Sequence, residues 1–143
     1  MLIKTITYTD FEGTKRTEEF HFNLMESELT EMNLSTHGGL EKELKRIIDS
    51  QNEAEIIATF KNIILKSYGI ISNEGRRFMK SEELSTAFSQ TNAYSKLYME
   101  LATDSKAAAE FINGIVPDEY RTPEEPPILT PVPSNDSAKA TTE

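Results

Sequence analysis

The sequence has no cysteine among its 143 residues, which excludes disulfides, thiolate metal sites and cysteine nucleophiles together. No stretch approaches the roughly 18 consecutive apolar residues that a membrane-spanning helix needs. Residues 1–5 also lack the apolar run and the small-residue cleavage site of a signal peptide. These absences predict a protein that stays in the compartment where it is made, and they fit a reducing compartment.

Positive charge is also scarce, with 15 basic against 24 acidic residues and a net charge of −9. A protein that gains its affinity by neutralising phosphates needs the opposite balance, so nucleic acid is not expected as the main partner. The apolar fraction of 37% is low for a globular protein, which indicates that one segment is locally polar.

The sequence signatures of catalysis and cofactor binding are missing. No GxGxxG occurs, and no Walker-type lysine and threonine follow the glycines. The two histidines, His21 and His37, are not spaced with each other or with a carboxylate as metal ligands are. Adjacent acidic residues such as Glu82 and Glu83 point apart and are typical of a solvated surface. We expect no cofactor, no metal and no enzymatic activity.

Proline is absent until Pro117, and all six prolines fall at or after that position. Beyond it the chain is rich in Pro, Ser, Thr and Glu and has few sizeable apolar residues, so it cannot bury enough surface to offset the entropy of ordering. The sequence therefore predicts a single globular domain over residues 1–117, within the usual size of about 100–150 residues. Residues 118–143 are predicted to form a disordered tail.

The chain begins with the pattern of a β-hairpin. Residues 2–9 are dense in Ile, Thr and Tyr, residues 10–13 supply a turn that ends in glycine, and residues 17–22 resume a strand pattern. Phe20 and Phe22 share one face of the second strand. Because an isolated hairpin is marginally stable in water, we expect one face to pack on the helices that follow.

The middle of the domain has the period of helices. A capping box at Asn23 and Glu26 predicts a first helix, and a second capping box at Ser50 and Glu53 predicts the strongest one, with Gly69 as its left-handed C-cap. Between these two, a further helix is predicted by the apolar spacing of Leu40, Leu44, Ile47 and Ile48.

The last part of the domain contains three more helix starts. Residues 70–80 are interpreted as a loop or a short irregular hairpin, after which Ser81 can cap one helix, Thr91 or Asn92 a second, and Thr103 or Asp104 a third. Gly114 and Pro117 are expected to close the last one. The predicted fold class is α+β and mainly helical, with an N-terminal β-hairpin packed on a bundle of five or six short helices.

Two groups of side chains are candidates for binding a partner. Arg76, Arg77 and Lys80 flank Phe78 in the one basic cluster of the sequence that contains an aromatic residue, and the acidity of the whole chain favours an acidic protein partner over nucleic acid. The second group is aromatic and is interpreted mainly as core, although the tyrosine hydroxyls suit a half-exposed interface. Its candidate partner-binding members are Tyr94, Tyr98 and Phe111.

The sequence resembles a family of small proteins encoded by long-tailed bacteriophages and prophages of Gram-positive hosts, the tail assembly chaperones. The resemblance covers about residues 1–117 and is a match of the overall sequence pattern, not of a reactive motif. It is carried by residues 4–11 with Gly13, by 19–24, by 57–61 and 66–69, by GRRFMKSEEL at 75–84, by 88–91 and 101–104, and by AAAEFINGI at 107–115.

The resemblance implies a protein that binds the tape-measure protein while the tail is assembled and helps to recruit the major tail protein. It further implies action in the host cell cytoplasm, frequent absence from the finished virion, and in some members a longer form made by ribosomal frameshifting. Helix-in-groove contacts from the region 94–111, strand addition at the hairpin edge and self-association are the expected modes of binding.

Two other functions remain open from the sequence. One is a structural protein of the phage tail or head-tail junction, which would remain in purified particles. The other is a small nucleic-acid-binding regulator acting through Arg76, Arg77 and Lys80, which would bind DNA in a salt-sensitive manner. An enzyme is the least expected class, because no nucleophile is paired with a base.

Overall fold

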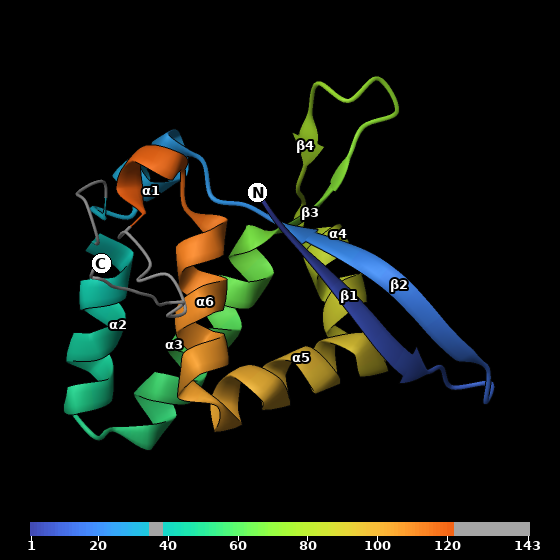
Figure 1. Cartoon of the computed structure of the whole chain (residues 1–143), viewed down its shortest axis with the longest axis horizontal. Coiled ribbons are helices and arrows are strands. Elements are labelled where there is room, and N and C mark those ends of the chain that lie inside the picture. Colours follow the sequence, from blue (N-terminus) through green and yellow to red (C-terminus); the bar gives the residue numbers. More distant parts are fainter. Residues whose placement is uncertain (35–38, 122–143) are drawn as a thin grey trace, which may run out of the picture.

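The computed structural model describes residues 1–34 and 39–121 (Figure 1). The predicted tail from residue 122 onward and His37 lie outside the described residues. The elements, in chain order, are β1 (Leu2–Thr9), β2 (Lys15–Phe22), α1 (Glu26–Glu31), α2 (Gly39–Asp49), α3 (Glu53–Ser67), β3 (Tyr68–Ile71), β4 (Phe78–Met79), α4 (Glu82–Ser89), α5 (Asn92–Thr103), α6 (Ser105–Ile115) and the short 3-10 helix η1 (Asp118–Tyr120).

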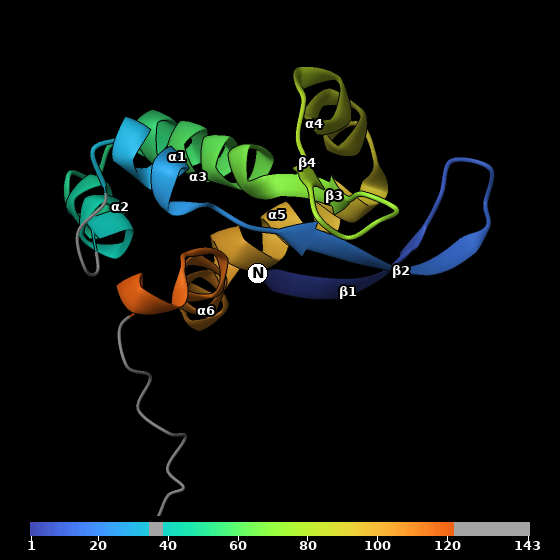
Figure 2. The ribbon, with the colours of Figure 1, turned by 90° about the horizontal axis from the view of Figure 1, so that it is seen from above.

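The predicted N-terminal hairpin is confirmed, with β1 and β2 antiparallel in a register that runs from Leu2 opposite Phe22 to Thr9 opposite Lys15. Alternation along the strands turns Ile6, Tyr8 and Phe22 into the core and leaves the other face to solvent. β2 continues through β3 to β4, so the four strands form one antiparallel sheet in sequence order. Seen from above, the β1–β2 hairpin extends beyond the helices (Figure 2).

Three predicted helix starts are confirmed, and the structure selects Thr91 over Asn92 and Asp104 over Thr103 as the caps. The side chains of Ser81, Thr91 and Asp104 accept hydrogen bonds from backbone N–H groups in the first turns of α4, α5 and α6. The interpretation of residues 70–80 as a short hairpin is also confirmed, because β3 and β4 pair across a turn in which Gly75 has a φ of +81°.

Two predicted capping boxes are wrong by two residues. α1 begins at Glu26 after Met25, whose N–H donates to Glu28 Oε1 at 2.7 Å. Asn23 lies before the helix, and its N–H donates to Ser67 O at 2.8 Å. In the second case Asn52, not Ser50, caps α3, while the Ser50 hydroxyl donates to Ile47 O at the end of α2. The second error arises because Ser50 lies between two helix ends and its hydroxyl bonds to the end of α2.

The prediction of Gly69 as a left-handed C-cap is also wrong. Tyr68 leaves α3 with extended dihedral angles, and Gly69 is a residue of β3 opposite His21. A Cβ atom at Gly69 would lie 2.7 Å from the Phe78 ring and 2.8 Å from Met79 O. Glycine is therefore required here by the close approach of β4, not by a positive φ.

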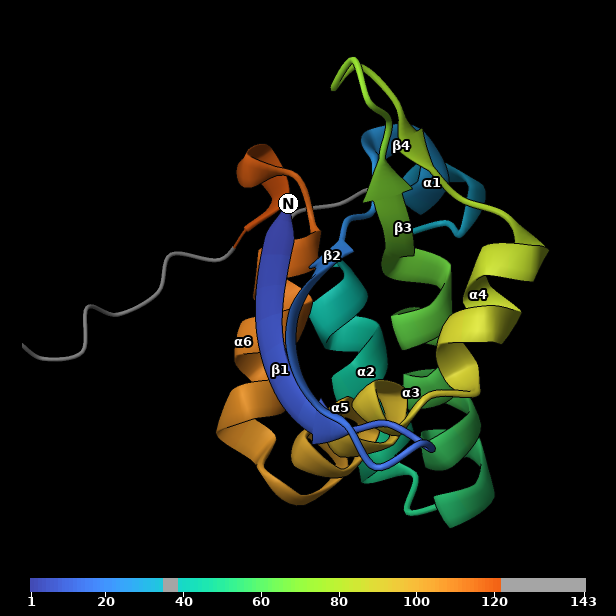
Figure 3. The same cartoon turned by 90° about the vertical axis from the view of Figure 1, so that its right-hand side faces the viewer.

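The helices enclose one core. α2, α3 and α6 stand side by side, α5 crosses near their ends and packs on β1, and α4 covers β3 (Figures 1 and 3). Aromatic rings join the sheet to the helices. The ring centroids of Phe22 and Phe111 lie 5.2 Å apart, and the Tyr68 ring stacks on that of Phe88 with centroids 4.3 Å apart. The predicted fold class, α+β and mainly helical with a hairpin packed on short helices, is confirmed.

The described chain continues past Pro117 through η1 to Arg121. Arg121 donates to Gly114 O and Val116 O and so satisfies backbone carbonyls at the end of α6. The domain boundary after residue 117 stays a prediction. Over the described ranges, no helix combines the length and the apolar character that a membrane span requires.

Candidate partner-binding surfaces

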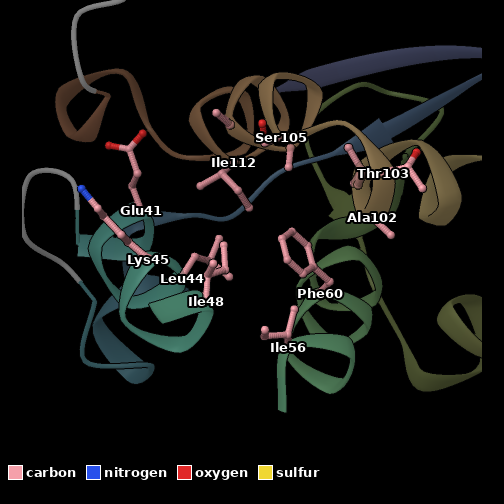
Figure 4. Close-up of a pocket in the computed structure, with 13 residues that line it drawn as sticks. Glu41, Leu44, Lys45, Ile48, Ile56, Phe60, Ala102, Thr103, Ser105 and Ile112 are labelled. Atoms are coloured by element: carbon pink, nitrogen blue, oxygen red, sulfur yellow. The ribbon is translucent and has the colours of Figure 1, made fainter. Parts of the chain in front are cut away.

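An apolar groove lies between α2, α3 and α6 and has a volume of about 470 Å³. Leu44 and Ile48 point into it from α2, Ile56 and Phe60 from α3, and Ile112 from α6 (Figure 4). Ile48 is 47% exposed, and the ring of Phe60 is only partly buried. The groove therefore offers accessible aliphatic and aromatic side chains along the axes of its three helices.

The rim of the groove is charged. Glu41 and Lys45 line it from successive turns of α2, and Thr103 and Ser105 line it from the junction of α5 and α6. A polar rim around an apolar floor is the usual anatomy of a protein-binding surface. The arrangement can accept one amphipathic helix, because such a helix places an apolar stripe on the floor and polar residues at the rim.

A second surface, here called the hairpin surface, is formed by the β3–β4 hairpin with the ends of α1 and α4. It is an open hollow of about 660 Å³, and β4 lies at the edge of the sheet. Figure 1 shows the hairpin projecting on the side of the molecule opposite α2. The residues that line the hollow include Met25, Arg76, Arg77, Phe78, Met79 and Leu84.

Of the predicted basic residues, Arg76 and Arg77 are exposed on this surface, and Arg77 lies 3.7 Å from Glu74. Lys80 is different. Its Nζ donates to Asn23 O at 2.6 Å and to both carboxylate oxygens of Glu28, at 2.8 and 2.9 Å. Burial lowers the pKa of Lys80, while the ion pair with Glu28 opposes that shift. Lys80 therefore binds within its own chain and contributes little free charge to the surface.

The predicted aromatic residues do not gather on one surface. Phe111 is 2% exposed and packs inside the core, so its ring is not presented to solvent. Tyr94 and Tyr98 are half-buried at the edge of the same core, 6.0 Å from each other, and neither lines the groove. The role of these residues in partner binding stays a prediction.

The outer edge of β1 is partly occupied by α5. Asn92 donates to Thr9 O and Lys96 to Thr7 O, both at 2.9 Å. An added strand would have to displace these side chains before it could pair with β1. Strand addition is thus more accessible at β4 than at β1.

Sequence reasoning missed Ile48, Ile56 and Phe60 as a surface. It placed Ile48 on an apolar helix face and did not single out Ile56 or Phe60. A signal was present in the adjacent pairs Ile47–Ile48 and Ile56–Ile57, because neighbouring residues on a helix diverge by about 100° and cannot both face one core. Ile47 is buried, whereas Ile48 and Ile57 are exposed.

The described residues contain no group of three or more side chains that could hold a metal ion. His21 is half-buried in β2, between Phe20 and Phe22. Within the described part of the chain, the structure thus brings together surfaces suited to binding.

Comparison with known proteins gives one match. The profile of a family described as phage tail assembly chaperone matches residues 1–141. No curated protein and no solved structure matches the chain significantly. The family's role indicates a protein that works by binding other tail proteins and not by catalysis. Since the match covers nearly the whole sequence, the chain belongs to the phage tail assembly chaperone family.

Proposed function

We propose that the chain binds the tape-measure protein during tail morphogenesis and helps to bring tail tube subunits to it. The observation that carries this proposal is the apolar groove between α2, α3 and α6. A tape-measure protein is long, helical and apolar, so it aggregates unless its exposed stripe is covered. The apolar floor and charged rim of the groove supply the chemistry to cover part of such a stripe.

Charge and size support the same conclusion. The net charge of −9 keeps a complex with an apolar partner soluble, because like-charged complexes repel one another. Several copies would be needed along a rod, and we propose that they bind side by side. Action in the host cell cytoplasm and absence from the mature virion follow from a role that ends when the tube is complete.

Co-expression with the tape-measure protein of the same phage tests the proposal. The full chain should keep that protein soluble and co-purify with it. The substitution Ile48→Asp places a charge on the groove floor and should reduce co-purification at least about tenfold, which corresponds to about 1.4 kcal/mol of binding free energy.

The matched control is Ile57→Asp. Ile57 is 54% exposed on α3 and does not line the groove, so this variant adds the same charge at a similar exposure elsewhere. It should bind as the unmodified chain does. The proposal is contradicted if both variants lose co-purification equally. It is also contradicted if the unmodified chain does not change the solubility of the tape-measure protein.

A further inference from the structure

We infer that the chain's own C-terminal segment, residues 124–133, docks in cis on the hairpin surface. This inference concerns a different surface from the groove and does not depend on the proposed function. It rests on where the described chain ends, on the length of chain that follows, and on the match of charge and apolar side chains.

The described chain ends beside α1, and the start of α1 at Met25 borders the hairpin surface. The Tyr120 hydroxyl donates to Glu26 Oε2 at 2.7 Å, and Arg121 is held by the carbonyls at the end of α6. Two residues further along α1, the Glu28 carboxylate accepts a hydrogen bond from Lys80 Nζ. Lys80 directly precedes Ser81, the N-cap of α4. The segment beyond Arg121 therefore departs beside the element that borders the surface.

The length of chain beyond Arg121 is sufficient. An extended, proline-rich chain advances about 3.1 Å per residue, so the eight residues from Arg121 to Leu129 span about 25 Å. Two side-chain contacts, Tyr120 to Glu26 and Glu28 to Lys80, connect the end of the described chain to the hairpin surface through α1. Residues 124–133 can therefore lie over the surface without unfolding any described element.

Charge complementarity favours this surface over the groove, because Arg76 keeps a net positive charge there even though Arg77 lies 3.7 Å from Glu74. Residues 122–143 carry four acidic residues and one lysine, and the acidic pair Glu124 and Glu125 comes first. The hairpin surface offers the exposed Arg76 and Arg77, whereas Lys45 on the groove rim is offset by Glu41. An acidic pair is thus attracted to the hairpin surface and meets no net positive charge at the groove.

The apolar side chains match in the same way. Ile128 and Leu129 follow the acidic pair and are flanked by Pro126, Pro127 and Pro131. The hairpin surface presents Met25, 49% exposed, beside the partly exposed Phe78 and Met79. Grooves lined by aromatic residues bind proline-rich segments at low entropic cost, because proline already restricts the backbone.

The absence of cysteine allows a direct test on the full chain. A single nitroxide spin label attached to the variant Ser134→Cys should broaden the amide signals of residues 76–80 in a ¹⁵N-labelled sample. Signals of groove residues such as Phe60 should keep their intensity. Reducing the label gives the reference spectrum.

A charge swap supplies the matched variants. Arg76→Glu with Arg77→Glu should abolish the broadening, and adding Glu124→Arg with Glu125→Arg should restore it. All four positions are exposed or outside the described fold, so the body of the domain should be unaffected. A second sample mixes spin-labelled chain at natural isotopic abundance with ¹⁵N-labelled chain that carries no spin label.

The inference is overturned by any of three results. These are unchanged signals at residues 76–80, broadening that survives the reversal of both arginines, and broadening that also occurs in the mixed sample. The last result would place the segment of one copy on the surface of another.

Discussion

Lys80 connects two parts of the chain that lie 52 residues apart in sequence. The Lys80 and Glu28 side chains are 19% and 18% exposed, and Asn23 O and the Met25 N–H complete the network. Such a group of partly buried polar atoms is stabilising only when every member is satisfied. Removing one member leaves the others without partners.

We predict that Lys80→Met lowers the free energy of unfolding by about 1–3 kcal/mol, because Glu28 then keeps a half-buried charge and Asn23 O loses a donor. Urea unfolding measures the change. The double variant Lys80→Met with Glu28→Gln should recover part of the loss. A single variant as stable as the unmodified chain would show that this network contributes nothing.

Tyrosine ionisation gives a pH dependence at the alkaline end. Burial raises the pKa of Tyr68 and that of Tyr94 above the ordinary value of 10.0. The unfolded chain then loses these phenol protons at a lower pH than the folded chain does. Their stabilising contribution is complete below about pH 10 and is lost as the pH rises through the folded-state pKa values.

The double variant Tyr68→Phe with Tyr94→Phe should therefore lose less stability between pH 9 and pH 11 than the unmodified chain, an interval set by the tyrosine pKa of about 10. Chemical unfolding at a series of pH values measures this difference, and lysine titration contributes equally to both proteins. Parallel curves for the two proteins would contradict the assignment.

At the scale of elements, the accuracy of sequence reasoning follows the range of the interactions involved. The caps at Ser81, Thr91 and Asp104 were predictable because each side chain bonds to a backbone N–H within three residues. The role of Gly69 was not predictable, because the need for glycine comes from Phe78, which lies nine residues later on the paired strand. The groove depends on how three helices pack, which their separate periodicities do not fix.

Gly69→Ala tests the close approach of β4 to β3. The added methyl group meets both a ring and a backbone oxygen, so β4 must shift, and we expect a loss of about 1–3 kcal/mol in the free energy of unfolding. Thermal or urea unfolding measures it. In a Phe78→Ala background the same substitution should cost less, since one of the two clashes is gone. An equal cost in both backgrounds would show that the ring is not the obstacle.

At the scale of the whole molecule, the described fold presents two surfaces of different chemistry on opposite sides. The groove is apolar with a rim of balanced charge, and the hairpin surface is basic with exposed methionine and aromatic side chains. A chaperone with two such surfaces can hold one partner in the groove while the other surface stays available for a second. The family assignment followed from the sequence, whereas the position of the groove required the packed helices.

Site-specific photo-crosslinking to the co-expressed tape-measure protein tests the central claim most directly. A crosslinking amino acid at Ile48, on the groove floor, is compared with one at Ile3, on the outer face of the β1–β2 hairpin; their exposures are 47% and 50%. We predict that the tape-measure protein is captured from position 48 and not from position 3. Equal capture from both positions, or capture from position 3 alone, would contradict the claim that the groove is the binding site.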